Sequence, residues 1–384
     1  MRMSNVVVIG GGVVGSAAAY RLARDGVPVT LVDRADPGHA TAAGAGIIAP
    51  ATSLAQPAAF YPLAFAAVAH YADLLAQLGE DGEPDTGYEV VGGLFIATSD
   101  AEEVRLADMW RLLERRGGEG APNIGALARL GPAEARALFP ALGQVRGGIH
   151  LTGAARVDGR RLRAAVQRAA QKRGATLLRG DAALVRAGER VTHVVVDGRS
   201  LPVGAAIIAG GAWSAALGAS VGVALPVYPQ RGQILHLELR DAETGAWPIV
   251  LGFHAHYLLT FPRSRVVAGA TREDEAGYDH RVTAGGAHEA LGEALRVAPG
   301  LADATLREVR VGFRPASPDR LPLLGRAPDL RNVYVATGHG ASGLQLGPYS
   351  GAVVAEVLRG QERRAGQGGP PAIDLTPYSP ERFV

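Results

Sequence analysis

The chain has 384 residues, which is long for a single hydrophobic core and predicts two domains. Its net charge of +2 gives no basic surplus for binding nucleic acid, and its lack of cysteine excludes disulfides, thiolate catalysis and thiolate metal sites. We expect no bound metal. No run of about 20 apolar residues is present, and the first residues lead straight into an expected strand. We therefore expect no membrane span, no signal peptide and a cytoplasmic location.

A glycine-rich turn follows the first expected strand, at residues 10–15. The strand is the apolar run 6–9, which is typical of a strand buried on both faces. Gly10 allows a tight turn, Gly12 lets a phosphate approach the backbone, and Gly15 lets the next helix pack close to the strand. Such a turn at the positive N-terminus of a helix can hold the pyrophosphate of a dinucleotide.

The helix after this turn is expected over about Val13–Arg24, and a second strand over Val29–Val32. Asp33 follows, 18 residues after Gly15, where an acid can accept hydrogen bonds from a ribose hydroxyl. A lone G-x-G-x-x-G motif is weak evidence in a chain with 52 glycines. The complete strand–helix–strand unit with its acid in place predicts a dinucleotide-binding fold.

Further elements follow from the spacing of apolar residues. Helices are expected over residues 61–78, 101–116, 130–138, 160–173, 287–297 and 346–359. Strands are expected over residues 88–97, 176–178, 183–185, 191–196, 203–208, 233–239, 257–261, 266–270, 306–313 and 332–337. The segment from 227 to 270 is dominated by alternating strands, which predicts an antiparallel sheet in a separate domain.

Small, glycine-rich segments accompany these elements, at residues 39–50, 209–214 and 338–343. The last two stand where a buried strand ends, and glycines there suit a loop pressed against a cofactor. Plain strand-to-helix turns, or a flexible linker at 39–50, would use the same residue types. Together with the first motif, these loops favour a cofactor site built from several parts of the chain.

In this order, these pieces resemble the D-amino-acid oxidase family of flavoenzymes, which includes glycine oxidase and sarcosine oxidase, over nearly the whole chain. The likeness is greatest to the glycine oxidase and D-amino-acid dehydrogenase branches. The motifs that carry it are Thr41…Ala45-Gly46-Ile47, Arg231-Gly232-Gln233, Gly269-Ala270-Thr271, Arg314-Pro315…Pro322…Gly325, Thr337-Gly338-His339…Gly343 and Pro377…Arg382-Phe383.

The resemblance implies an α/β chain (α+β overall) with a Rossmann-like FAD-binding domain and a substrate domain whose antiparallel sheet covers the flavin. The FAD-binding domain is expected to be discontinuous. The expected bounds are 1–85, 150–222 and 320–364 for the FAD-binding domain, 86–149 and 223–319 for the substrate domain, and 365–384 for a C-terminal tail.

The resemblance also implies which residues contact FAD. The N-terminal glycines would face the pyrophosphate and Asp33 the adenosine ribose, while Ala183 would place its backbone at the adenine. Residues 343–345 would direct N–H groups at the flavin, where they stabilise negative charge on the reduced ring. The full expected set is Gly10, Gly12, Val13, Val14, Gly15, Asp33, Arg34, Thr41, Ala45, Gly46, Ile47, Ala183, Gly210, Gly211, Trp213, Arg314, Gly338, His339, Gly340, Gly343, Leu344 and Gln345.

We expect FAD to be bound non-covalently. No cysteine is present to form a thioether. In relatives with a histidyl bond the histidine directly precedes the small-residue loop, and Ala42 occupies roughly that place here, with His39 three residues away.

The reaction that the resemblance implies is oxidation of a small amino acid, a D-amino acid or a glycine-like amine, to the imino acid by hydride transfer to flavin N5. Arg314 matches the family's carboxylate-binding arginine, whose planar fork binds both oxygens. Tyr257 matches a tyrosine above the flavin, although a half-buried aromatic on a strand would fit equally well. Ile47 and His339 are expected to line the substrate pocket, with a structural role an even alternative for His339.

Several alternatives stay open. Some relatives carry a second arginine where this chain has Ala341, so sarcosine-like secondary amines and cyclic imino acids such as D-proline remain candidate substrates. A non-catalytic FAD subunit of a dehydrogenase complex would need neither Arg314 nor Tyr257. An NAD-only dehydrogenase would leave the C-terminal glycine loop unexplained.

The expected partners are a small amine substrate and an electron acceptor, either oxygen or another molecule. The only lysine, Lys172, lies on an expected helix of the cofactor domain, which removes one route to oxygen activation. A homo-oligomer stays open.

Overall fold

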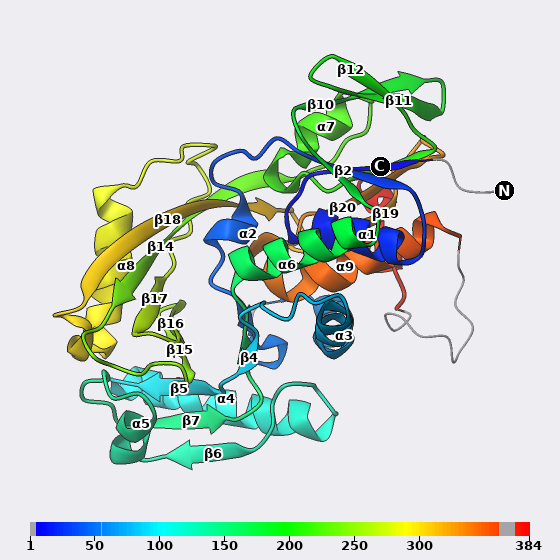
Figure 1. The fold of residues 1–384 in the computed structure, drawn as a ribbon. Helices are drawn as coiled ribbons and strands as arrows, with labels where there is room; N and C mark the ends of the chain where they lie inside the picture. Colours follow the sequence, from blue (N-terminus) through cyan, green and yellow to red (C-terminus); the bar gives the residue numbers. More distant parts are fainter. Residues whose placement is uncertain (1–4, 55, 361–372) are drawn as a thin grey trace.

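The computed structural model describes residues 5–54, 56–360 and 373–384, so positions 365–372 of the expected tail lie outside the described residues. A six-stranded sheet forms one half of the molecule, in the order β19-β20-β13-β1-β2-β9 (Figure 1). Its strands are parallel except for the β19–β20 pair. They span β1 Val6–Ile9, β2 Val29–Asp33, β9 Thr176–Arg179, β13 Ala205–Ile208, β19 Leu323–Arg326 and β20 Val333–Thr337.

The alternation of side chains along β1 explains the two layers that cover this sheet. Val6 and Val8 pack into a core shared with four helices, whereas Val7 and Ile9 pack into a second core on the opposite face. The helices are α1 Val13–Arg24, α3 Phe60–Glu80, α6 Gly159–Lys172 and α9 Gly343–Leu358. The opposite face carries a three-stranded antiparallel sheet of β10 Ala182–Ala187, β11 Arg190–Val196 and β12 Arg199–Pro202, followed by α7 Ser214–Ala219.

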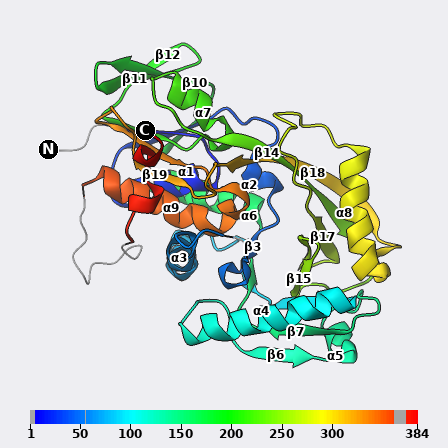
Figure 2. The ribbon, with the colours of Figure 1, turned by 180° about the vertical axis from the view of Figure 1, so that it is seen from behind.

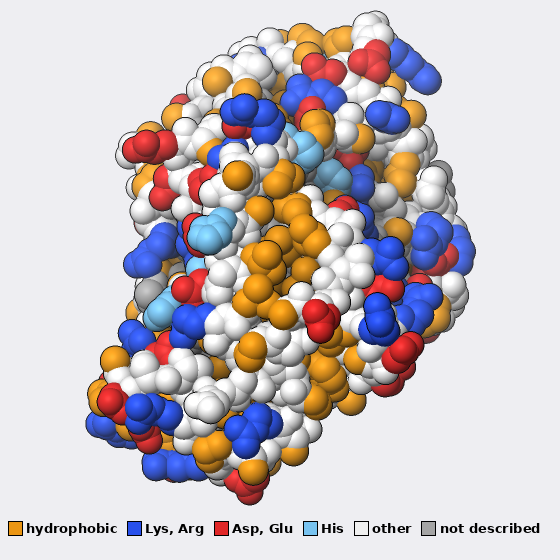
Figure 3. All heavy atoms as spheres, turned by 90° about the vertical axis from the view of Figure 1, so that its left-hand side faces the viewer, with side chains coloured by type: hydrophobic (Ala, Val, Ile, Leu, Met, Phe, Trp, Pro, Cys, Tyr) orange, Lys and Arg blue, Asp and Glu red, His pale blue; other side chains and the backbone are white. Residues whose placement is uncertain are grey.

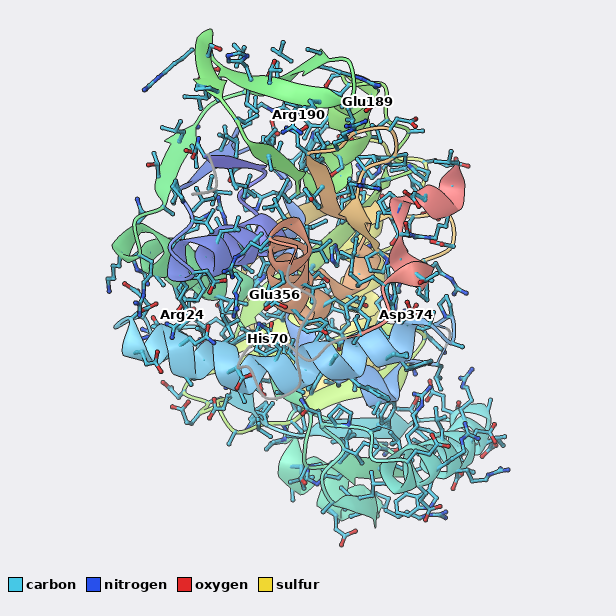
Figure 4. The ribbon with its side chains drawn as sticks, turned by 90° about the vertical axis from the view of Figure 1, so that its right-hand side faces the viewer. Arg24, His70, Glu189, Arg190, Glu356 and Asp374 are labelled. Atoms are coloured by element: carbon cyan, nitrogen blue, oxygen red, sulfur yellow. The ribbon has the colours of Figure 1, made fainter. Side chains whose placement is uncertain are left out.

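Helices α1 and α9 approach each other closely because α9 presents glycine. A Cβ at Gly351 would lie 2.3 Å from the carbonyl oxygen of Val14, so only glycine fits there. Helix α3, which carries His70 (Figure 4), packs on the same layer. The ring of His70 lies 5.7 Å from that of Tyr349 on α9. These contacts fix the N-termini of α1 and α9 relative to each other.

An eight-stranded sheet forms the other half, in the order β18-β14-β17-β16-β15-β5-β7-β6 (Figure 2). The expected antiparallel pairing holds except between β15 and β5, which are parallel. The strands span β5 Gly93–Ala97, β6 Leu127–Leu130, β7 Gly147–Leu151, β14 Tyr228–Glu238, β15 Ile249–Phe253, β16 His256–Phe261, β17 Arg265–Gly269 and β18 Thr305–Ala316. The helices of this half are α4 Asp100–Gly118, α5 Pro132–Leu138 and α8 Ala284–Val297.

Two expected elements of this half differ from the structure. The strand expected over 88–97, with a bend at Gly92-Gly93, is divided at this bend into β4 Glu89–Val90 and β5, because Gly92 takes a positive φ of 80°. The helix expected from Leu130 begins at Pro132, and Leu130 closes β6. Proline is well placed at a first helical turn, where its missing N–H has no partner to lose.

The short strands β3 Ile47–Ile48, β8 Ala155–Arg156 and β4 form a small sheet between the two halves. The six-stranded sheet draws its strands from the three ranges expected for the FAD-binding domain, while β7 crosses the expected boundary at 149/150. The domain division itself stays a prediction. Hydrophobic side chains gather near the middle of the face seen in Figure 3, with charges of both signs around them.

Among the helices of the described residues, none combines the length and the hydrophobicity needed to cross a bilayer. The described part of the chain also holds no cluster of three or more histidine, aspartate or glutamate side chains arranged to bind a metal.

Candidate active site

A cavity of about 420 Å³ lies where the two halves meet. The carboxyl ends of β1, β2, β13 and β20 open into it, as expected for a ligand site of a parallel sheet. The opposite wall comes from β14, β16 and β18 of the eight-stranded sheet. Most of the residues expected to bind FAD or substrate line this one cavity: Gly10, Gly12, Val13, Val14, Asp33, Arg34, Thr41, Ala45, Gly46, Ile47, Ala183, Gly210, Gly211, Trp213, Tyr257, Arg314, His339, Gly340, Gly343, Leu344 and Gln345.

Two residues of the expected set, Gly15 and Gly338, do not line the cavity. A Cβ at Gly15 would lie 2.0 Å from the carbonyl oxygen of Gly10, so this glycine lets α1 pack onto the end of β1. Gly338 takes a positive φ of 78° in the turn after β20. Both shape the backbone around the cavity and do not form its wall.

The N-terminus of α1 faces the cavity and is capped by a residue of the small loop. Thr41, in the short helix α2 Ala40–Ala43, accepts a hydrogen bond from the backbone N–H of Val13 at 3.0 Å through its Oγ1. The loop and the glycine-rich turn are therefore joined, although they are 28 residues apart. The remaining first-turn N–H groups of α1 point a positive helix end at this part of the cavity.

Asp33 lines the cavity at the end of β2, but its carboxylate already has a protein partner that the sequence did not reveal. Nη2 of Arg163, on α6, donates to Asp33 Oδ2 at 2.5 Å, and its Nε donates to the carbonyl oxygen of Gly11 at 2.5 Å. Arg163 thus fixes the acid against the glycine-rich turn. No local pattern marks this arginine, because its two contacts are more than a hundred residues away in sequence.

The first turn of α9 forms another wall, and its helix begins at Gly343, three residues before the expected start. The hydroxyl of Tyr71 donates to the carbonyl oxygen of Leu344 at 2.5 Å, and the Gln345 side chain accepts from the N–H of Ala49 at 3.2 Å. These bonds hold the helix end in place while leaving its first N–H groups directed toward the cavity.

Arg314 lies within β18, not after a strand as expected, opposite Gln230 of β14. The strand continues through Pro315 because β18 is the edge of its sheet, where a proline needs no partner on the open side. Nη1 of Arg314 donates to the carbonyl oxygens of Thr271 at 3.0 Å and of Arg231 at 3.3 Å. Burial lowers the pKa of this guanidinium, and no carboxylate of the described residues pairs with it.

Tyr257 and His339 line the same cavity as Arg314, and these three residues are expected to mark its substrate end. Burial raises the pKa of the Tyr257 phenol, against the opposing charges of Arg314 and Arg272, so the phenol stays protonated. His339 is 5% exposed, and burial lowers its pKa to about 4, so the imidazole is neutral near pH 7. Its Nε2 is buried without a hydrogen-bond partner among the described residues.

Sequence reasoning missed a second arginine at this end. Arg272 lines the cavity, and its Nη1 donates to the carbonyl oxygen of Ala255 at 3.1 Å. The signal was present, because Arg272 directly follows the motif Gly269-Ala270-Thr271, but nothing in the sequence gave the direction of its side chain.

Comparison with known proteins identifies the family. The model of the FAD dependent oxidoreductase family matches residues 5–357. The chain belongs to this family. The chain is an FAD-dependent amino-acid oxidoreductase, as expected for an enzyme acting on a CH–NH2 or CH–NH group, and its predicted α/β fold class is confirmed.

Relatives of the family resemble the chain over its whole length. An uncharacterized oxidoreductase, YurR, of Bacillus subtilis (strain 168) is 43% identical over 379 residues, covering 98% of this chain and 99% of YurR. The crystal structure of iminodiacetate oxidase (IdaA) from Chelativorans sp. BNC1 is 42% identical, with a TM-score of 0.91 and 98% of each chain covered. That of glycine oxidase from Geobacillus kaustophilus is 28% identical, with a TM-score of 0.86 and both chains covered completely.

The cavity fits FAD, the cofactor of the family. Two helix N-termini, of α1 and α9, face the same space, and the positive ends of helices suit a pyrophosphate and an electron-rich ring. The unpaired Nε2 of His339 is a buried polar atom that needs a ligand partner. Acidic side chains gather around Arg34 at one end, and guanidinium groups at the other, which matches a long ligand with distinct ends.

Proposed function

We propose that this oxidoreductase oxidises a small amino acid, a D-amino acid or a glycine-like amine, to the imino acid. The observation that carries the proposal is the half-buried Arg314 of the cavity wall, whose guanidinium hydrogen-bonds neutral oxygens and forms no ion pair with a carboxylate among the described residues. A guanidinium that is partly removed from water without an ion-pair partner is costly, so the site favours a ligand that brings an anion. A substrate carboxylate supplies that anion in a bidentate geometry.

Bound FAD supplies the two-electron acceptor for the hydride that leaves the substrate α-carbon. The chain's own groups orient the substrate. Arg314 holds the carboxylate and thereby fixes the α-carbon, since one rigid charged contact removes most of the freedom of a small molecule. The protonated Tyr257 donates or accepts one hydrogen bond beside it.

His339 fits a role of orientation better than one of acid–base catalysis. With a pKa of about 4 it carries no proton to give near neutral pH, and its unpaired Nε2 can accept a hydrogen bond from the cofactor or substrate. Ile47 would supply an apolar wall to the substrate pocket.

A secondary amine is the second candidate substrate. It is supported by the 42% identity to an iminodiacetate oxidase, an enzyme named for a secondary amine, whereas the glycine oxidase of Geobacillus kaustophilus is 29% identical. A non-catalytic FAD subunit fits less well, because a scaffold has no need of the unpaired arginine in the cavity.

The test is anaerobic mixing of the purified protein with glycine, sarcosine, D-proline, iminodiacetate and pairs of D- and L-amino acids, while the flavin absorbance is followed. Bleaching by one group identifies the substrate class and its stereochemistry. Readmitting air then separates an oxidase from a dehydrogenase. Absence of bleaching by every amine would contradict the proposal.

A further inference from the structure

Arg272 stands at the substrate end of the cavity as a second cation beside Arg314. It follows β17, and the bond from its Nη1 to the carbonyl oxygen of Ala255 anchors it to the turn between β15 and β16. Its charge opposes the rise that burial causes in the pKa of Tyr257 and adds to the fall that burial causes in the pKa of Arg314, so it acts on the same space as these two residues. Its other N–H groups have no hydrogen-bond partner among the described residues.

The acidic side chains next to Arg272 in sequence do not neutralise it. Glu273 accepts hydrogen bonds from Arg231 at 3.0 Å and from Gln233 at 2.8 Å. Asp274 accepts from Gln230 at 2.8 Å. Neither carboxylate forms an ion pair with Arg272 among the described residues, and the Arg272 side chain is exposed to the space of the cavity.

The acidic residues that line the cavity lie at its other end. Asp36 and Asp181 pair with Arg34 at 2.8 and 3.1 Å, and Asp33 pairs with Arg163. Among the described residues, the cavity lining has no other carboxylate. Arg314 and Arg272 thus line this end of the cavity without a lining carboxylate among the described residues, while the charges of Glu273 and Asp274 act on Arg314 from outside the lining.

A charge count selects the substrate. An amino acid with one carboxylate and a neutral amine carries a charge of −1, and bound on Arg314 it leaves Arg272 without a carboxylate partner. An amine with two carboxylates carries −2 and balances both guanidinium groups. Charge complementarity of this kind affects specificity more than affinity, because a ligand with one carboxylate leaves one of the two arginines without an ion-pair partner.

We propose that Arg272 binds a second carboxylate of the substrate, so that the substrate is a small dicarboxylic amine, with one carboxylate on Arg314 and the other on Arg272. The inference rests on the proposed function and makes Arg272 a specificity-determining residue. Two sources share this chemistry: N-carboxymethyl amines and amino acids with an acidic side chain.

The test measures binding separately from turnover. Diglycolate is a dicarboxylate with an ether oxygen in place of the amine, and methoxyacetate is its monocarboxylate counterpart. Their dissociation constants are measured by calorimetry on the holoenzyme and on the Arg272→Gln variant. We expect diglycolate to bind the wild type more tightly, and Arg272→Gln to weaken diglycolate by roughly five- to fiftyfold while leaving methoxyacetate within about twofold.

Two further variants control the measurement. Arg314→Gln should weaken both ligands, since each places a carboxylate there. Arg281→Gln, on the same connection but outside the cavity, should weaken neither, because Arg281 pairs with Asp279 at the surface. Unchanged FAD content and thermal midpoint establish that the variants fold.

Equal binding of the two ligands by the wild type, or equal weakening of both by Arg272→Gln, would overturn the inference. Failure of the proposed function is a different result: diglycolate binding that depends on Arg272, with no flavin bleaching by any amine. Comparing kcat/KM for iminodiacetate against sarcosine, and for aspartate against alanine, then tells which source supplies the second carboxylate.

Discussion

Replacing Gly232 by alanine tests the placement of Arg314 without touching the arginine itself. Gly232 lies in β14 directly beneath the guanidinium, and a Cβ there would lie 2.5 Å from Nη2 and 2.6 Å from Cζ and Nη1 of Arg314. Ordinary contacts begin at 3.4 Å, so the guanidinium must move by about 0.9 Å (3.4 − 2.5). It can do so because it is the far end of a flexible side chain.

The displaced arginine should bind the substrate carboxylate poorly. A hydrogen bond to a charged group contributes about 1.5–3 kcal/mol, which corresponds to about a 10- to 150-fold loss in kcat/KM. The loss should fall mainly on KM, because the contact binds the substrate in the ground state as well. The assay is steady-state kinetics with the substrate that bleaches the flavin, together with the thermal midpoint and FAD content.

The matched control is Gly292→Ala, on α8, where a Cβ would meet nothing within 4 Å. This variant should keep wild-type kinetics. If Gly232→Ala also keeps wild-type kcat/KM in a folded, FAD-loaded protein, then Arg314 does not bind the carboxylate in the position described, and the reasoning fails.

Three further substitutions test other parts of the fold. Gly351→Ala should destabilise the protein by about 1–3 kcal/mol and speed FAD loss, because the backbone of Val14 cannot yield to the new methyl; a wild-type melting curve would contradict this. Thr41→Val leaves the buried N–H of Val13 without its acceptor and should lower the free energy of unfolding by about 1–3 kcal/mol, whereas Thr41→Ser should restore it. Burial lowers the pKa of His236 to about 3. Below about pH 6.5 the unfolded chain therefore binds a proton at His236 that the folded protein does not bind. The free energy of unfolding consequently falls as the pH drops toward 3. His236→Leu should remove about 2–3 kcal/mol of the loss between pH 7 and pH 4.5, measured by denaturant unfolding; equal losses in both proteins would refute the assignment.

Local sequence patterns predicted the cofactor half of the fold well. The expected helix 13–24 has the observed bounds, because the glycine-rich turn and the apolar periodicity both act within a few residues. The motif residues also converge on one cavity. Their roles in catalysis stay predictions, since the cavity shows where side chains lie and not what they do to a substrate.

Long-range contacts explain what the sequence could not predict. Arg163 reaches Asp33 across 130 positions, and Arg272 is placed by a bond to a turn of a neighbouring hairpin. The extension of β18 past Arg314 depends on its being an edge strand, which is a property of the whole sheet. None of these long-range contacts produces a periodic pattern in the neighbouring sequence.

The N-termini of α1 and α9 face one cavity, and this arrangement determines when the protein can bind its cofactor during synthesis. Val13 and Gly343 begin these helices and are separated by 330 positions (343 − 13), yet both face the same cavity. A nascent chain can form β1 and α1 early. The wall of the cofactor site that α9 supplies is absent until α9 has left the ribosome. Capture of the flavin therefore comes at the end of translation, and a chain truncated before α9 should be colourless.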